Sequence, residues 1–177
     1  NCDCEYCYER KRPGIMQNDV QKATISFVKR SYEAEPFDTL RVCWYGGEPL
    51  LALDTIETLS KELRRFCCER AISYRAHLLS NATLADDAAC ERIAACGVSS
   101  CMPTLDGRQE THDARRKSKN GQSLYEQTKS NIVRLAKRGI TTTCNVNVDK
   151  RNLSEYHELK QELKGIEGLS LYPRGVV

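Results

Sequence analysis

The regular alternation of helix-patterned and strand-patterned segments constrains this chain more than any other feature of its sequence. Apolar residues recur at helical spacing over five segments, at about residues 17–32, 53–70, 85–96, 124–138 and 153–163. Runs rich in β-branched and aromatic residues lie between them, at about residues 39–45, 73–79, 98–104, 140–148 and 169–172. Ser123 is expected to cap the fourth helix and Gly139 to end it. Such alternation is typical of βαβ units, so the sequence predicts an α/β fold with a parallel sheet.

Polar and glycine residues follow the expected strands at several points. Residues 46–49 read Gly-Gly-Glu-Pro, residues 80–81 read Ser-Asn, and residues 104–107 read Thr-Leu-Asp-Gly. In parallel α/β barrels the chemistry lies where strands end and loops begin, so these segments predict a site at one rim. Taken singly, each segment is equally well explained as an ordinary turn, because glycine, proline and asparagine punctuate turns generally.

Composition excludes several classes of protein. The chain has 177 residues, 40% of them hydrophobic, with 27 Lys and Arg against 24 Asp and Glu. That balance suits one folded domain and excludes a disordered chain. The net charge of +3 includes no basic block, no apolar run reaches the roughly 18 residues of a membrane span, and no secretory signal opens the chain. We therefore expect a cytoplasmic protein with neither nucleic acid nor membrane as a partner.

Ten cysteines are many for a chain of this length. Small secreted disulfide scaffolds place their cysteines in loops and have few helices, whereas this chain has long helical patterns. We therefore expect a reducing compartment, with a metal or redox site near the amino terminus and buried thiols elsewhere. The amino-terminal thiols are Cys2, Cys4 and Cys7. The others are Cys43, Cys67, Cys68, Cys90, Cys96, Cys101 and Cys144.

Cys4 and Cys7 form a C-x-x-C pair, which is compatible with half of a zinc site, a redox pair or half of an iron–sulfur site. A zinc ribbon needs a second such pair, but Cys67 and Cys68 are adjacent on a predicted helix. A thioredoxin-type pair opens a helix after a strand, and the sequence predicts no strand before Cys4. The spacing alone does not choose among these sites.

Taken together, the motifs resemble the radical S-adenosylmethionine (radical SAM) enzymes. The closest resemblance is to the peptide- and protein-modifying branch, which includes anaerobic sulfatase-maturating enzymes and SPASM-domain peptide maturases. That branch has Cys-Asn-x-x-Cys-x-Tyr-Cys-Tyr, and this chain is similar from Asn1 to Tyr8. Cys4 and Cys7 then match the second and third cluster ligands. The first would precede Asn1, and Cys2 falls on a variable position.

Three further segments follow in the family's order. Residues 45–51 are similar to its Gly-Gly-Glu-Pro segment. Residues 79–84 are similar to its Thr-Asn-Gly-Thr-Leu segment, with Ser80 for threonine and Ala82 for glycine. Residues 104–116 are similar to its Ser-Leu-Asp-Gly…His-Asp-x-x-Arg segment. The resemblance thus covers nearly the whole chain.

The resemblance implies a [4Fe–4S] cluster held by Cys4 and Cys7, and S-adenosylmethionine (AdoMet) bound to it. Glu48 would orient the AdoMet amino group and Arg116 would bind its carboxylate. The full implied cofactor-binding set is Tyr6 beside the adenine, Gly46, Gly47, Glu48 and Pro49 at the amino group, Ser80, Asn81 and Thr104 on the ribose side, and Arg116. Reductive cleavage of AdoMet would yield a 5′-deoxyadenosyl radical that abstracts hydrogen from the substrate. No further catalytic residue is assigned.

The family's fold is a partial (β/α)6 barrel of the TIM type, with parallel strands and outer helices. The resemblance implies that residues 1–177 are its core domain, without the first strand and truncated at the amino terminus and at the carboxyl terminus. It implies a peptide or protein substrate, as in sulfatase maturation or ribosomal peptide modification, and an electron donor such as flavodoxin or ferredoxin. Two alternatives stay open: a zinc-binding thiol-rich module, and a non-catalytic truncated barrel that acts as a scaffold.

Overall fold

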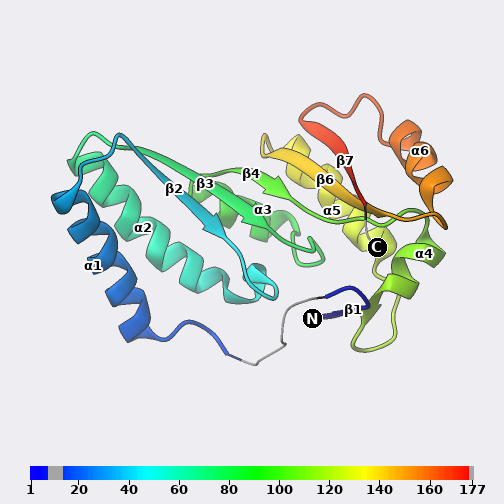
Figure 1. Ribbon diagram of the computed structural model, residues 1–177, viewed down its shortest axis with the longest axis horizontal. Coiled ribbons are helices and arrows are strands. Elements are labelled where there is room, and N and C mark those ends of the chain that lie inside the picture. Colours follow the sequence, from blue (N-terminus) through cyan, green and yellow to red (C-terminus); the bar gives the residue numbers. More distant parts are fainter. Residues whose placement is uncertain (8–13, 176–177) are drawn as a thin grey trace.

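A five-stranded parallel sheet forms the centre of the molecule (Figure 1). The structure is a computed structural model and describes residues 1–7 and 14–175. The strand order is β2-β3-β4-β6-β7. The bounds are β2 (Thr39–Trp44), β3 (Ser73–Leu79), β4 (Val98–Met102), β6 (Thr141–Val148) and β7 (Leu169–Gly175).

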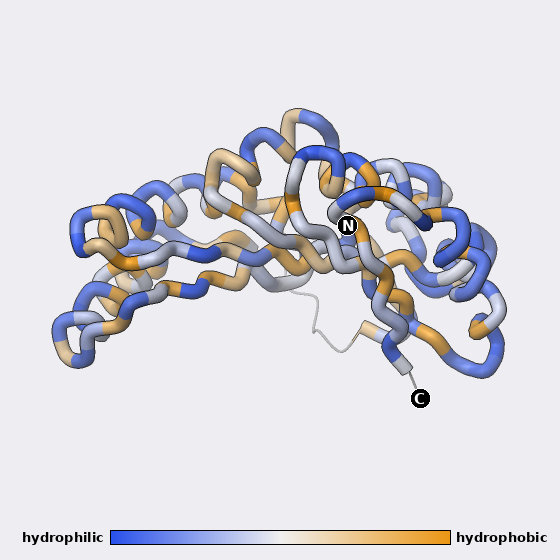
Figure 2. The backbone as a smooth tube through the Cα atoms, turned by 90° about the horizontal axis from the view of Figure 1, so that it is seen from above, coloured by the Kyte–Doolittle hydropathy of each residue, from blue (hydrophilic) through white to orange (hydrophobic). Residues whose placement is uncertain are grey.

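Helices connect successive strands, as the alternation predicts. They are α1 (Asn18–Ala34), α2 (Leu53–Glu69), α3 (Asp87–Ala95), α4 (Gln109–Arg115), α5 (Tyr125–Lys137) and α6 (Leu153–Glu162), with a 3-10 turn at Pro49–Ala52. Seen from above, the sheet is an open arch with helices along its convex side (Figure 2). The predicted α/β fold with outer helices is therefore confirmed among the described residues, as an open sheet rather than a closed barrel.

The side chains of each strand alternate between the helices and the concave face. Ala76 and Leu78 of β3 are buried in the core, where Val42 and Trp44 of β2 pack against them. The largest fully buried side chains come from the helix faces and strands together; they include Leu59, Leu78, Ile93, Ile132 and Leu135. A strand with one buried face has the alternating pattern that the sequence showed.

The predicted cap of the fourth helix was wrong. The helix begins after Leu124, whose side chain makes no capping bond, and Ser123 accepts only a 3.4 Å hydrogen bond from the amide of Tyr125. Asp113 of α4 accepts a 3.0 Å hydrogen bond from the amide of Leu124 instead. A carboxylate from a neighbouring helix therefore takes the place that a local serine was expected to fill.

A small antiparallel pair of strands, β1 (Cys2–Cys4) and β5 (Arg116–Ser118), was not predicted. Cys4 itself ends β1, which corrects the expectation that no strand precedes the C-x-x-C pair. Helix α4 was not predicted either, since its sequence reads as a charged loop. Three-residue strands and a seven-residue helix are too short to show an apolar period.

All ten cysteines are free thiols, and Cys67, Cys90, Cys96, Cys101 and Cys144 are buried. Cys43 and Cys68 are exposed, so the expectation of buried thiols holds for five of the seven cysteines outside the amino-terminal group. Among the helices of the described residues, none combines the length and apolarity needed to span a bilayer.

Candidate functional site

The loop after β2 opens the backbone at the rim of the sheet. Gly46 has φ of 157°, and a Cβ on Gly46 or Gly47 would meet no atom within 4 Å. Glycine adopts this φ readily, and it has no side chain that would shield the backbone from a ligand. The two predicted glycines therefore lie in a loop whose amides and carbonyls a ligand can approach.

Glu48 follows this loop and is buried, with 7% of its surface exposed. Its carboxylate accepts hydrogen bonds from the hydroxyl of Ser80 at 2.7 Å, the amide of Asn81 at 2.7 Å and the amide of Leu50 at 3.0 Å. Burial raises the pKa of this carboxyl, against the effect of these hydrogen bonds. A carboxylate has about four acceptor sites, so one stays open for a further donor. Pro49 opens the 3-10 turn that brings Leu50 into place.

Asn81 ties the loop after β3 to the amino-terminal segment. Its side-chain NH2 donates to the Oδ1 of Asn1 at 2.8 Å and to the thiol sulfur of Cys2 at 3.4 Å. Its Oδ1 accepts from the amide and the hydroxyl of Thr83. Ala82, which stands where the family has glycine, is buried at φ of 60°. The loop therefore adopts the left-handed conformation that glycine favours, despite the alanine.

Strand β5 holds the cysteine segment in place. Cys4 lies opposite Arg116, and the amide of Cys7 donates to the carbonyl of Cys4 at 3.2 Å, which closes a turn over the C-x-x-C pair. Burial raises the pKa of the Cys2 and Cys4 thiols, while the charge of Arg116 opposes this rise. The described residues contain no group of three or more His, Cys, Asp or Glu side chains placed to bind one metal ion.

Tyr6, Asp106 and Arg116 form a buried hydrogen-bonded group next to Cys4. The Tyr6 hydroxyl donates to the carboxylate of Asp106 and accepts from Arg116 Nη1 at 2.7 Å. Asp106 is fully buried, and its other oxygen accepts from the amide of Asn147 at 2.9 Å. Burial raises the pKa of the Tyr6 hydroxyl, which therefore stays protonated and bridges the two charges. The role of Asp106 as this link was not predicted.

Thr104 and the residues after it complete the rim. Thr104 forms a parallel bridge with Asn145 of β6, which sets the end of β4 beside the neighbouring strand. Gly107 has φ of 68°, and a Cβ there would lie 2.3 Å from a carboxylate oxygen of Glu155. That oxygen accepts a 2.8 Å hydrogen bond from the amide of Arg108. The positive φ favours glycine here, and a Cβ at this position would displace the Glu155 side chain of α6.

His112 of α4 carries a pH dependence of stability. It is 1% exposed, its Nδ1 accepts from the Asp106 amide at 3.2 Å, and its ring packs edge-on against Tyr125. Burial lowers the pKa of His112 to about 4. The positive charge of Arg116 lowers this pKa further, while the negative charge of Asp113 partly offsets the decrease. Because the unfolded chain binds this proton more readily, the contribution of neutral His112 to stability is complete above the pKa of the unfolded state, about 6.5. It is lost as the pH falls from there toward the pKa of the folded state, about 4. We expect urea unfolding to show a loss of ~3 kcal/mol between pH 7 and pH 4.

The control is His112→Gln, whose side-chain oxygen can accept the same amide hydrogen bond but does not titrate. This variant should lose most of the pH slope between pH 7 and pH 4, while His157→Gln, on the neighbouring α6, should retain it. An unchanged slope in His112→Gln would assign the effect to other groups.

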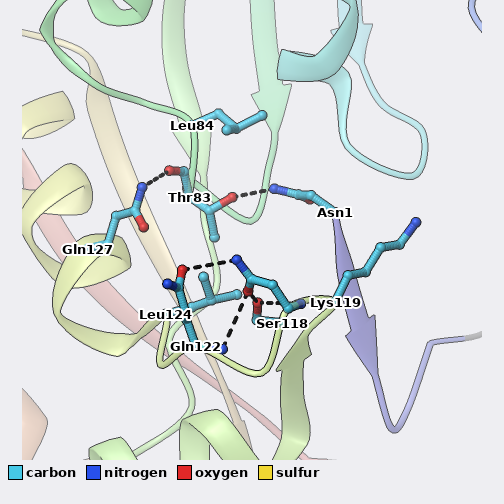
Figure 3. A pocket seen from close by; sticks show the side chains of 9 residues that line it. Asn1, Thr83, Leu84, Ser118, Lys119, Gln122, Leu124 and Gln127 are labelled. Carbon is cyan, nitrogen blue, oxygen red and sulfur yellow. Dashed lines mark hydrogen bonds between the residues drawn. The ribbon is translucent and has the colours of Figure 1, made fainter.

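A pocket of about 390 Å³ opens beside Asn1 and Thr83 (Figure 3). Gln127 donates to the Thr83 carbonyl at 2.9 Å, and Asn1 donates to the Thr83 hydroxyl at 2.6 Å. None of the predicted cofactor-binding residues lines this pocket. The pocket therefore adjoins the Asn81 network but is separate from the rim that Glu48 and Arg116 occupy.

The structure brings the predicted site residues together by direct contact in two groups. Glu48 contacts Ser80 and Asn81 at the ends of β2 and β3, and Asn81 reaches the cysteine segment. Tyr6 contacts Arg116 beside Cys4. An open parallel sheet with helices outside and polar groups gathered at the carboxyl ends of its strands defines a protein of the (β/α)-barrel class with a cofactor-type site at the rim.

The family follows from comparison with known proteins. The chain matches the model of the radical SAM superfamily over residues 1–163, and it belongs to that superfamily. The cofactors of this family are a [4Fe–4S] cluster and S-adenosylmethionine. The chain is 28% identical over 150 residues to an uncharacterized protein of Synechocystis sp., a match that covers 79% of this chain and 36% of that protein.

Solved structures show the same fold. Native anSMEcpe with bound AdoMet and Cp18Cys peptide superposes with a TM-score of 0.81 at 22% identity, over 98% of this chain and 47% of that one. Native anSMEcpe with bound AdoMet gives the same TM-score at 21% identity, over 48% of its length. SuiB of Streptococcus suis gives 0.63 at 16% identity, over 38% of its length. The chain therefore spans about half or less of the length of these relatives.

Proposed function

We propose that this chain is the core of a radical SAM enzyme that modifies a side chain of a peptide or protein. Membership of the superfamily supports an oxidoreductase-type radical SAM enzyme. The observation that carries the proposal is the buried Glu48 carboxylate at the strand ends, with an open acceptor site beside an uncovered glycine loop. Such a carboxylate is suited to a ligand ammonium group.

In this proposal Glu48, the glycine loop and Arg116 form the AdoMet site, because they offer an anion, open backbone groups and a cation. Cys4 and Cys7 would hold the cluster. We assign the ammonium group of AdoMet to Glu48 and the glycine loop. We assign its carboxylate to the guanidinium of Arg116, the residue paired in register with Cys4 between β1 and β5. When bound, the two cofactors supply reductive cleavage and hydrogen-atom abstraction. Tyr6 holds the guanidinium in place, since its hydroxyl donates to Asp106 while accepting from Arg116.

The adjoining polar residues have supporting roles in this proposal. Ser80, Asn81 and Thr104 line the ribose side, and Tyr6 lies beside the adenine. Ser80 and Asn81 already donate to Glu48, so they fix the orientation of its carboxylate whether or not a ligand is present. The protein thereby preorganises the acceptor before the cofactor arrives.

A peptide substrate is supported by the likeness to anSMEcpe, whose structures include bound peptides. Sulfatase maturation and ribosomal peptide modification are the two candidate reactions. We further propose that residues 1–177 form the core domain of a longer enzyme, supported by the share of the relatives that the chain spans. An electron donor such as flavodoxin or ferredoxin and a cytoplasmic location complete the proposal.

The test is anaerobic reconstitution with iron and sulfide of the chain extended at its amino terminus to include the cysteine expected before Asn1, followed by EPR of the reduced protein with and without AdoMet. We expect iron and sulfide to bind, and the EPR signal to shift when AdoMet is added. Cys4→Ser and Cys7→Ser should each lose most of the iron, because each removes a proposed ligand. Cys43→Ser, an exposed thiol on β2, is the matched control and should retain it.

Other outcomes would contradict the proposal. Uptake of zinc in place of iron, without any effect of AdoMet, would establish a thiol-rich zinc module. A folded protein that binds neither iron nor AdoMet would indicate a scaffold.

A further inference from the structure

The concave face of the sheet is positively charged and has no acidic side chain on any of its strands. The sequences of β2, β3, β4, β6 and β7 contain no aspartate or glutamate. Arg41 of β2 and Arg75 of β3 alternate with the core residues Val42 and Ala76, so both lie on the face opposite the helices. Arg174 of β7 lies one residue before the end of the described chain and is paired in register with Asn147.

Arg41 and Arg75 are direct cross-strand neighbours, paired in register between β2 and β3. Adjacent strands are about 4.8 Å apart, and like charges directly opposite one another destabilise a sheet. Both side chains are exposed, and neither has a hydrogen bond or an ion pair with any residue that the structure describes. The fold therefore holds two guanidinium groups side by side without neutralising them.

Seven other arginines of the described residues are neutralised by acidic side chains. Ion pairs with Asp or Glu are formed by Arg65, Arg92, Arg108, Arg115, Arg134, Arg138 and Arg151. Arg30, Arg64 and Arg70, on or beside the helices, form no such ion pair either among the described residues. What distinguishes Arg41 and Arg75 is therefore their in-register pairing on adjacent strands, which places two like charges opposite each other. This pairing suggests a partner that brings the negative charge.

We propose that Arg41 and Arg75 bind the carboxylate of an acidic residue in an extended peptide substrate, a proposal that rests on the proposed function. Guanidinium groups bind carboxylates through paired N–H donors, which suits one acidic side chain between two arginines. Between this pair and the rim lie Cys43 and His77, and the His77 Nδ1 is 2.8 Å from the Ser100 hydroxyl oxygen. These groups offer polar contacts to the peptide on its way to the rim.

The register predicts where the acidic residue lies in the substrate. Arg41 precedes Gly46 by five residues, which is ~16 Å along a strand. An extended peptide covers about 3.3–3.6 Å per residue. The acidic residue should therefore lie about four or five residues from the side chain that is modified.

The experiment measures peptide binding by fluorescence anisotropy with the chain before reconstitution. The probe is a short labelled peptide with two adjacent glutamates about four residues from a cysteine, and its twin has glutamines in their place. We expect the acidic peptide to bind at least about tenfold more tightly than the twin at low salt. The double variant Arg41→Gln/Arg75→Gln should lose this preference.

The matched control is Arg30→Gln/Arg70→Gln, which removes the same charge from exposed arginines outside the sheet. It should retain the preference. The concave-face variant should also unfold at the same or a higher urea concentration than the parent, because a like-charge pair has been removed. Circular dichroism of both variants checks that the fold is kept.

Three results would overturn the proposal: no preference for the acidic peptide, an equal loss in the control variant, or tighter binding of a single-stranded oligonucleotide through the same arginines. Because no cluster or AdoMet is present, these results do not depend on the radical chemistry. Failure of the reconstitution test with a retained acidic preference would leave a peptide-binding surface without the proposed enzyme.

Discussion

Glu48→Ala is expected to lower the affinity for AdoMet by about a hundredfold or more, which corresponds to ~3 kcal/mol. The variant removes the buried anion that would bind the ammonium group. It also leaves the Ser80 hydroxyl and the amides of Leu50 and Asn81 without their acceptor. Buried donors without a partner are costly, so the free energy of unfolding should fall by about 3 kcal/mol. Equilibrium dialysis with labelled AdoMet and urea unfolding measure the two effects.

Glu48→Gln separates the charge from the hydrogen bonds. Its side chain has the same shape, and its amide oxygen can still accept from two of the three donors, so stability should recover more than AdoMet affinity. Glu69→Gln, on the exposed end of α2, is the matched control and should change neither. AdoMet affinity that is unchanged in Glu48→Ala would exclude this carboxylate from the binding site.

The pH dependence of AdoMet binding gives a second check on Glu48. Burial raises the pKa of its carboxyl, so the anion becomes protonated at a higher pH than an exposed glutamate would. Binding of the ammonium group needs the anion. Affinity should therefore weaken as the pH falls toward the acid range, and Glu48→Gln should not show this dependence.

The sheet and its main helices could be predicted because their signal is local and repeated. Helix α2 shows its apolar face over 17 residues, and its buried Ile56, Leu59, Leu63 and Phe66 follow the helical period. The β1–β5 pair offers no such signal, since it consists of two three-residue strands more than a hundred residues apart. Its formation depends on contacts between residues far apart in the sequence, which no local pattern records.

The site divides along the same line. Glu48, Ser80 and Asn81 each follow a predicted strand, and neighbouring parallel strands bring their ends together, so their proximity follows from the order of the elements. The hydrogen bond between Tyr6 and Asp106 joins residues one hundred positions apart. No spacing rule predicts this hydrogen bond. The position of Asp106, directly after the buried Leu105 near the end of a strand, does mark it as a candidate site residue.

Asp106→Ala is expected to produce a large loss of stability, ~3 kcal/mol, because it removes the buried carboxylate to which the Tyr6 hydroxyl links the Arg116 guanidinium and leaves buried donors without an acceptor. Arg116 is 7% exposed. Burial by itself lowers the pKa of its guanidinium, but the neighbouring Tyr6, Cys4 and Asp106 raise that pKa by more, so the group stays charged. The variant also removes the acceptor of the Tyr6 hydroxyl and of the Asn147 amide. Urea unfolding measures the loss.

The same variant should loosen the cysteine segment before the whole fold opens. Tyr6 connects that segment to Asp106 and Arg116, so amide hydrogen exchange of residues 1–7 should quicken more than that of β3 in the core. Asp106→Asn keeps the shape and one acceptor oxygen, and its effects should be smaller. Asp54→Ala breaks an ion pair in which the aspartate side chain is 93% exposed, and it should leave both measurements nearly unchanged. Uniform quickening across the sheet in Asp106→Ala would instead show that Asp106 supports the core as a whole, and that the cysteine segment is held by the β1–β5 hydrogen bonds alone.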